Sequence, residues 1–268
     1  MTKTILITGA TDGIGRATAR NLAEKGHDLL IHGRNAEKLT ATASDLRALP
    51  GAGRVETFKA DLSDLAEVAR LASDLRAAHD RIDVLINNAG VYKTDHPTAQ
   101  SGEDIRFVVN TFAPALLTRL LLPVIPAKGR IVHLSSAAQA PVDLDAMAGR
   151  KRLEAMEAYA QSKLALTMWS AALAEELGRG GPVTVAVNPG SLLATNMVRE
   201  GFGVSGNDIG IGADILSRAA LSDEFADATG LYFDNDAGHF SAPHPDANKS
   251  AAVALVVRAI EDRIAGYL

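Results

Sequence analysis

Tyr159 and Lys163 are the two side chains of this sequence best suited to proton transfer. They lie four residues apart in a predicted helix, so both side chains project from the same helix face. A tyrosine hydroxyl is a weak base at neutral pH because its ordinary pKa is about 10. A nearby ammonium group stabilises the phenolate and lowers that pKa toward the operating pH. The same spacing also occurs on ordinary exposed helix faces, so by itself the pair indicates catalysis only weakly.

A glycine-rich turn near the N-terminus is suited to binding a phosphate group. Residues 3–8 read KTILIT, an apolar β-rich run, and Gly9, Gly13 and Gly15 follow before a predicted helix. Gly9 would permit a tight turn, Gly13 would let the backbone approach a phosphate, and Gly15 would let the helix pack closely on the sheet. The free N–H groups of that helix would then face a pyrophosphate.

The spacing of these glycines leaves an alternative open. It differs from the dinucleotide fingerprint G-x-G-x-x-G, and a P-loop is excluded because no Lys-Ser or Lys-Thr pair follows the last glycine. The turn alone is therefore also compatible with a plain strand-to-helix connection.

Strands and helices alternate along the whole chain. Strands are predicted at residues 3–8, 28–32, 54–59, 83–86, 130–134, 182–187 and 230–233, and helices at residues 16–25, 36–49, 64–79, 102–122, 158–177, 213–221 and 250–264. This alternation predicts a single α/β domain over residues 1–268. The expected architecture is a Rossmann-type doubly wound parallel sheet of about seven strands, with helices on both faces.

Polar and glycine-containing motifs follow the ends of six predicted strands. In an open parallel sheet these ends line one crevice, and ligands bind there. We therefore expect the following residues to meet in space: 9–15, Arg34, Asp61, 87–90, Ser136 and 189–190.

The composition argues against several other classes of function. The 268 residues carry a net charge of −5, and none of them is cysteine. This charge gives no reason to expect a nucleic-acid partner, and a chain without cysteine forms no disulfide and uses no thiolate. The seven histidines lack the spacing of a metal site. The chain starts directly with a strand, and its longest apolar stretch contains Arg119, so we expect a cytoplasmic protein with neither a signal peptide nor a membrane span.

Together these motifs resemble those of the short-chain dehydrogenase/reductase family. They occur in the family's order between residue 3 and about residue 235: TGATDGIG at 8–15, ADL at 60–62, NNAG at 87–90, Asn110, SS at 135–136, YAQSK at 159–163 and NPG at 188–190. The long separation of Ser136 from Tyr159, and VNTFAPALLT around Asn110, resemble the branch that includes retinol-dehydrogenase-like reductases. The resemblance implies an oxidoreductase that interconverts a carbonyl and an alcohol by hydride transfer.

The resemblance also implies four catalytic residues. Tyr159 would be the general acid/base, and Lys163 would bind the nicotinamide ribose and lower the pKa of Tyr159. Ser136, the second serine of its pair, would hydrogen bond the substrate oxygen, while Ser135 would have a structural role. Asn110 would position Lys163 through a water molecule, or would simply be a buried asparagine that kinks its helix.

The cofactor-binding residues follow from the same resemblance. The glycine turn would hold the pyrophosphate, Asp61 and Leu62 would flank the adenine, and Asp61 would accept a hydrogen bond from its amino group. Thr195 could bond the carboxamide, although it lies one residue further along than in many relatives. The full predicted set is Thr8, Gly9, Thr11, Asp12, Gly13, Ile14, Gly15, Arg34, Asn35, Asp61, Leu62, Asn87, Ala89, Gly90, Tyr159, Lys163, Pro189, Gly190 and Thr195.

The end of the second predicted strand favours NADP over NAD, although NAD stays possible. NAD enzymes of this fold usually have an acidic residue there, which would repel a 2′-phosphate. Here the strand ends in HGRN at 32–35, where Arg34 could grip a phosphate in a bidentate pair and Asn35 could add a donor. Asp12 stands where many NADP-using relatives have a basic residue, so it either weakens NADP binding or caps the following helix.

Three further expectations concern function and assembly. The alternatives to carbonyl chemistry are reduction of a ring double bond on the same fold and nucleotide sensing without catalysis; a sensor would need none of the four catalytic residues.

Residues 191–212 are rich in glycine and carry apolar Met197 and Phe202, so they are predicted to form a substrate loop, either a closing lid or a surface loop. The family resemblance also implies a homodimer or homotetramer.

Overall fold

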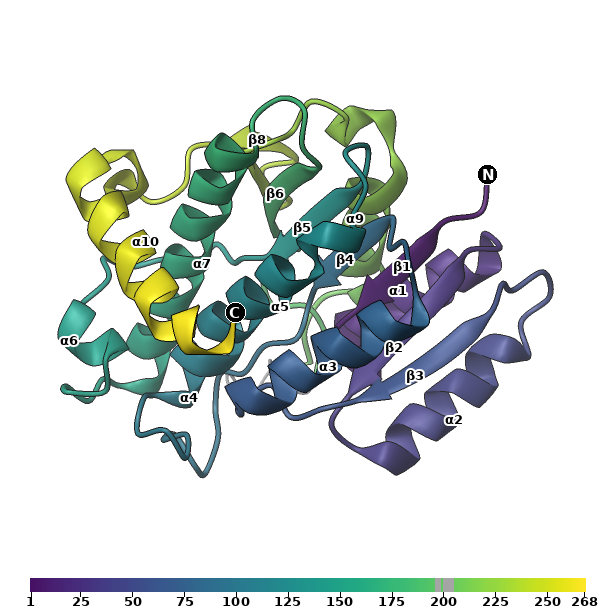
Figure 1. Cartoon of the computed structure of the whole chain (residues 1–268), viewed down its shortest axis with the longest axis horizontal. Helices are drawn as coiled ribbons and strands as arrows, with labels where there is room; N and C mark the ends of the chain where they lie inside the picture. Colours follow the sequence, from purple (N-terminus) through teal and green to yellow (C-terminus); the bar gives the residue numbers. More distant parts are fainter. Residues whose placement is uncertain (196–198, 200–204) are drawn as a thin grey trace.

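One eight-stranded sheet organises the computed structural model of this protein (Figure 1). The structure describes residues 1–195, 199 and 205–268. The strands lie in the order β3-β2-β1-β4-β5-β6-β7-β8, and only the pair β7–β8 is antiparallel. They are β1 Thr4–Ile7, β2 Asp28–Gly33, β3 Val55–Lys59, β4 Val84–Asn87, β5 Arg130–Leu134, β6 Val183–Asn188, β7 Tyr232–Asp234 and β8 His239–Ser241. The order reverses between β1 and β4, which confirms the doubly wound architecture.

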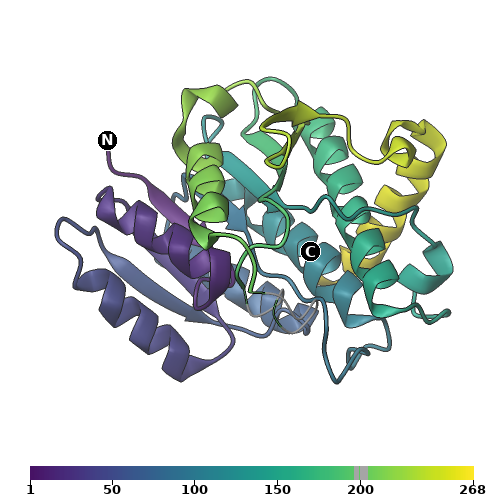
Figure 2. The same ribbon diagram turned by 180° about the vertical axis from the view of Figure 1, so that it is seen from behind.

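Helices cover both faces of the sheet, as the two opposite views show (Figures 1 and 2). Helices α3, α5 and α7 pack on one face, and α1, α2 and α9 on the other. The helices are α1 Gly13–Glu24, α2 Ala36–Arg47, α3 Leu65–Ala78, α4 Ile105–Phe107, α5 Ala113–Leu121, α6 Leu144–Met147, α7 Ala155–Leu177, α9 Ile209–Leu221 and α10 Ser250–Ile264. Because both faces are covered, the central strands are almost entirely apolar.

The pleat of β1 separates the two cores. Leu6 belongs to the cluster under α3, α5 and α7, whereas Ile5 and Ile7 belong to the cluster under α1, α2 and α9. The alternation follows from the period of two residues in a strand. All three side chains are completely buried.

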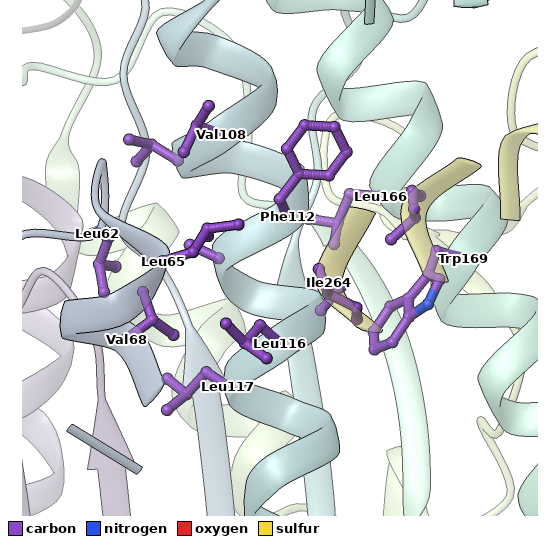
Figure 3. Packing of buried hydrophobic residues seen from close by; sticks show 14 of the residues in the cluster. Leu62, Leu65, Val68, Val108, Phe112, Leu116, Leu117, Leu166, Trp169 and Ile264 are labelled. Atoms are coloured by element: carbon purple, nitrogen blue, oxygen red, sulfur yellow. The ribbon is translucent and has the colours of Figure 1, made fainter. Parts of the chain in front are cut away.

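The larger core joins the C-terminal helix to the middle of the chain. Ile264 of α10 lies beside Trp169 of α7 and near Phe112 (Figure 3). The fully buried Trp169 donates its Nε1–H to Glu261 Oε1 at 2.7 Å, and Arg119 donates to the same oxygen at 2.7 Å. Helix α10 is therefore held against α5 and α7 by both apolar packing and charge-assisted hydrogen bonds.

The apolar segment Ile105–Val124 belongs to this core. Among the described residues it is a segment that is long and apolar enough to cross a bilayer, with a mean hydropathy of 1.6. However, 72% of its most apolar window is buried inside the fold. Packing against α3 and α7 therefore accounts for its composition.

The structure differs from the predicted elements in four places. The single helix predicted at 102–122 is divided into α4, a π-helical segment Val108–Phe112 and α5. Residues 137–157, for which no element was predicted, contain α6, and α9 begins at Ile209 rather than near residue 213. The short antiparallel strand β8 was not predicted.

The predicted substrate loop is described only at its ends. Residues 196–198 and 200–204, which include Met197 and Phe202, lie outside the described residues. Leu193 forms an isolated parallel bridge with Asn207, which joins the two described ends.

The Glu261 contacts generate a stability prediction. Replacing Glu261 with Ala leaves the buried Nε1–H of Trp169 and the Arg119 guanidinium without this acceptor. We expect the free energy of unfolding to fall by about 1.5–3 kcal/mol, the usual range for hydrogen bonds to a charged group. Urea denaturation followed by circular dichroism measures this change.

The neighbouring Asp262→Ala variant is the control. Within the described residues the ion pair of Asp262 is with Arg258, at 3.5 Å, and both side chains are more than 70% exposed. Such a pair contributes about 0.5 kcal/mol or less. Equal losses in the two variants would contradict the role given to Glu261.

Candidate active site

A cavity of about 660 Å³ lies at the carboxyl ends of the parallel strands. This volume is typical of sites that bind cofactors and other small molecules. The predicted site residues that line it are Gly9, Thr11, Asp12, Gly13, Ile14, Gly15, Arg34, Asp61, Leu62, Ala89, Gly90, Ser136, Tyr159, Lys163, Pro189, Gly190 and Thr195. The loops after six parallel strands therefore converge as their polar motifs predict.

The glycine turn has the backbone geometry that its glycines predict. Gly9 and Gly13 have φ angles of +65° and +54°, a region that side chains with a Cβ adopt rarely. A Cβ on Gly15 would lie 2.3 Å from both the Gly9 carbonyl oxygen and Asn88 Nδ2. Asp12 caps α1, and its carboxylate accepts from Gly13 N at 2.7 Å. The capping role predicted for Asp12 is thus present in the structure.

The end of β2 presents one cation to the cavity. Arg34 is exposed and lines the cavity, and it makes no hydrogen bond or ion pair with the described part of the chain. Asn35 does not line the cavity; it caps α2, and its Oδ1 accepts from Lys38 N at 2.9 Å. At the end of β3, Asp61 accepts from the backbone and hydroxyl of Ser63 at 2.9 and 2.8 Å through one oxygen.

Tyr159, Lys163 and Ser136 meet at the other end of the cavity. Lys163 Nζ lies 5.7 Å from the centroid of the Tyr159 ring and donates to the carbonyl oxygen of Leu134 at 2.6 Å. The Ser136 hydroxyl interacts with Tyr159 in a way that favours a lower pKa of the tyrosine. The hydroxyl of Ser135 instead bonds Thr167 at 2.7 Å. Both serines line the cavity, and the substrate role of Ser136 stays a prediction.

Burial sets the ionisation of the tyrosine and the lysine. It lowers the pKa of Lys163 to about 8, because a charged ammonium loses its hydration there. Burial also raises the pKa of Tyr159, with a smaller contribution from Tyr92, while the bond from Ser136 opposes the rise. This differs from the expected lowering of the Tyr159 pKa: among the protein's own groups, desolvation outweighs stabilisation of the phenolate.

Asn110 lies behind the cavity wall, in the π-helical segment. Its Oδ1 accepts from Val91 N at 2.8 Å, and its Nδ2 donates to the Val91 carbonyl at 3.0 Å and to Ser162 Oγ at 2.9 Å. A Cβ on Gly90 would lie 3.3 Å from Asn110 Oδ1 and 3.6 Å from Lys163 Nζ. The asparagine thus holds the loop after β4 beside Lys163.

Two predicted cofactor residues face away from the cavity. The buried Thr8 hydroxyl accepts from the backbone N–H groups of Asn88 and Ala89 at 3.0 and 3.1 Å. Asn87 is the last residue of β4, and its amide bonds Thr118 and His133 in the core. Both residues brace the site from behind.

Asn88, which is not among the predicted site residues, lines the cavity where Asn87 does not. Its Nδ2 donates to the carbonyl oxygens of Thr8 and Gly9 at 2.8 and 3.2 Å. The adjacent asparagines Asn87 and Asn88 predict an asparagine at this point of the site. The sequence alone does not determine which of the two is the last residue of the strand.

Two aromatic residues of the cavity, Tyr92 and His32, were not assigned a catalytic or cofactor-binding role from the sequence. Tyr92 packs edge-on against Tyr159, with centroids 5.3 Å apart. His32 is buried at the end of β2, where both ring nitrogens contact backbone atoms of neighbouring loops. His32 stands in HGRN at 32–35, where the prediction concerned only Arg34 and Asn35.

Comparisons with known proteins agree with this geometry. A family model described as short chain dehydrogenase matches residues 3–202. Human retinol dehydrogenase 13 is 33% identical over 265 residues, which cover 91% of this chain and 79% of the human protein.

Solved structures extend the similarity along the chain. A crystal structure of an uncharacterised protein from Mycobacterium paratuberculosis has a TM-score of 0.78 at 29% identity, covering 98% of this chain and 92% of that one. A candidate short-chain dehydrogenase from Shigella flexneri 2a, solved in complex with NADP, has a TM-score of 0.69 at 29% identity, covering 87% of this chain and 97% of that one. Since the family match spans well over half of its residues, this chain belongs to the short-chain dehydrogenase/reductase family and to its retinol-dehydrogenase-like branch.

Proposed function

We propose that this protein is an NADP(H)-dependent oxidoreductase that interconverts a carbonyl and an alcohol. The main evidence for this proposal is one cavity lined by two groups of residues. Ser136, Tyr159 and Lys163 meet at one end of it, and the glycine turn and Arg34 lie at the other. The NADP complex of the Shigella relative supports the choice of cofactor. The name of the human relative, a retinol dehydrogenase, supports alcohol and carbonyl chemistry.

The residues of the cavity fit a nicotinamide dinucleotide. The free N–H groups at the start of α1 suit a pyrophosphate, and Arg34 has no partner in the described chain that would compete for a 2′-phosphate. Asp61 keeps one carboxylate oxygen free of the Ser63 bonds, so it can accept from an adenine amino group. Pro189, Gly190 and Thr195 would border the nicotinamide. When bound, the cofactor supplies or accepts the hydride at its nicotinamide ring.

Tyr159 moves the proton of the reaction. In the reducing direction its hydroxyl donates a proton to the substrate oxygen, and in the oxidising direction the phenolate takes that proton back. Ser136 donates a hydrogen bond to the same oxygen and so orients the carbonyl. At neutral pH most Lys163 side chains keep their proton, because their pKa is about 8. That positive charge stabilises the phenolate as it forms.

The substrate end of the cavity favours an apolar compound. The cavity lining includes the apolar and aromatic side chains of Val91, Tyr92, Ile105, Val109 and Met156. Transfer of an apolar substrate out of water onto these side chains is favourable in proportion to the buried area. We infer an aldehyde or ketone with a substantial hydrocarbon part. A cytoplasmic location and a homodimeric or homotetrameric assembly stay predictions.

Replacing Tyr159 with Phe tests the catalytic assignment. We expect turnover to fall about a hundredfold or more, because only the proton donor is lost, while the Kd for NADP⁺ changes little. Steady-state kinetics and calorimetric titration measure the two quantities. The control is Tyr267→Phe, which removes a hydroxyl near the C-terminus, outside the cavity lining. A Tyr159→Phe variant that kept more than a few per cent of wild-type activity would contradict the assignment.

Replacing Arg34 with Ala tests the cofactor preference. Loss of charge-assisted bonds to the 2′-phosphate should cost about 1.5–3 kcal/mol of transition-state stabilisation with NADPH. This corresponds to a roughly 10- to 150-fold lower kcat/KM for NADPH. The value for NADH should change far less. Arg54→Ala is the matched control, because Arg54 is an exposed arginine beside the opposite end of β2, paired with Asp28. A wild type that prefers NADH, or a variant with an unchanged cofactor ratio, would refute the preference.

A further inference from the structure

The imidazole of His32 joins two loops that border the cavity. Its Nδ1 contacts Gly9 N of the glycine turn at 3.3 Å, and its Nε2 contacts the carbonyl oxygen of Ala60, after β3, at 3.1 Å. The side chain is 3% exposed and lies at the end of β2, one residue before Gly33 and two before Arg34. Three strand ends therefore meet at one side chain.

The partners of His32 fix its ionisation state. A backbone N–H can only donate, so Nδ1 must accept from Gly9, and a carbonyl can only accept, so Nε2 must carry the hydrogen. This is the neutral imidazole with its proton on Nε2. Burial lowers the pKa of His32, against smaller opposing contributions from the Ala60 bond and Asp61. The neutral form is thus the one that the surroundings favour.

The backbone around His32 adds to the same junction. The His32 carbonyl accepts from Ala10 N at 2.9 Å, so the glycine turn is bonded to both the main chain and the side chain of this residue. A Cβ on Gly33 would lie 2.6 Å from Thr11 Cγ2, which shows how closely β2 approaches the turn. A displaced imidazole would therefore move the turn relative to the ends of β2 and β3.

We propose that His32 is a positioning residue for cofactor binding, which holds the glycine turn and the segment around Asp61 in mutual register through its two ring nitrogens. The inference rests on the proposed function. It assigns to His32 no contact with the reacting atoms, because the imidazole acts through Gly9 and Ala60. Loss of the side chain should therefore weaken dinucleotide binding while the chemical step at saturating cofactor is preserved.

The test compares wild type with His32→Leu, which keeps the bulk of the side chain and loses both hydrogen bonds. Calorimetric titration with NADP⁺ and with NAD⁺ gives Kd, and kinetics at saturating cofactor give kcat. We expect Kd of the preferred cofactor to rise about tenfold or more, the equivalent of two neutral hydrogen bonds, with kcat within twofold of wild type. A general loss of structure would instead lower kcat in proportion to the folded fraction.

His27→Leu is the matched control. His27 precedes β2 at its opposite end, and its Nδ1 also accepts from a backbone N–H, that of Lys3, at 3.2 Å. This variant loses the same kind of bond away from the cavity, so its Kd should stay within twofold of wild type. Equal weakening in the two variants would overturn the proposal.

Two single-bond variants keep the test decisive even if His32→Leu does not fold. In His32→Asn an amide oxygen can replace Nδ1 as the acceptor for Gly9, and in His32→Gln an amide nitrogen can replace Nε2 as the donor to Ala60. We expect each to bind the cofactor more weakly than wild type, and at least one to bind more tightly than His32→Leu where that variant folds.

The binding measurements distinguish a failure of the His32 inference from a failure of the proposed function. Wild-type Kd values in the His32 variants, with wild type binding a dinucleotide, would overturn this inference alone. A wild type that binds neither dinucleotide would overturn the proposed function and this inference together.

Discussion

The close approach of the glycine turn to the loop after β4 is the constraint on which the cavity depends. The chain order of the sheet reverses between β1 and β4, so the loops after these strands leave in different directions and open a crevice. Asn88 bridges that crevice with two bonds to the turn, and Gly15 fits against it only because it lacks a Cβ. A larger residue at position 15 would force apart the backbone that the phosphate site needs.

The second constraint is the cost of burying ionisable groups at the end of β5. Burial favours the neutral form of both Lys163 and Tyr159, so their charged forms need compensation. The bond from Lys163 to the Leu134 carbonyl and the contact of Ser136 with Tyr159 provide part of it. An oxidised nicotinamide ring is a cation and would add a favourable charge beside a phenolate. On the proposed function, the tyrosine would therefore become an effective base only in a cavity that holds the oxidised cofactor.

Much of the fold follows from local patterns in the sequence. Apolar runs that end in glycine or polar motifs predicted six of the parallel strands and the convergence of their ends, because every such strand points its carboxyl end to the same edge. The helix Ser250–Ile264 and the strand Arg130–Leu134 have the predicted bounds. The periodicity and the apolar residues that form these elements lie within one short segment of sequence. Such elements can therefore be predicted without knowing their neighbours in the fold.

The rest depends on contacts between distant segments. The π-helical turn at Asn110 is tied to Val91 and Ser162, which are remote in sequence. Strand β8 is only three residues long, and it is stabilised by pairing with β7 and by the contact of Phe240 with Phe225 and Phe233. Which of Asn87 and Asn88 faces the cavity depends on where β4 ends, and shifting that end by one residue exchanges the two faces. His32 belongs to the HGRN motif, but its contacts with Gly9 and Ala60 depend on the fold and cannot be predicted from the motif.

Transfer of deuterium from NADPH to a carbonyl carbon tests the central claim most directly. The enzyme is incubated with [4,4-²H₂]NADPH and a panel of apolar aldehydes and ketones, and the products are examined by mass spectrometry. We predict an alcohol that carries one deuterium on the former carbonyl carbon, with one NADP⁺ formed for each alcohol. Binding of NADPH with no labelled alcohol from any member of the panel, or deuterium delivered to a carbon–carbon double bond instead, would contradict it.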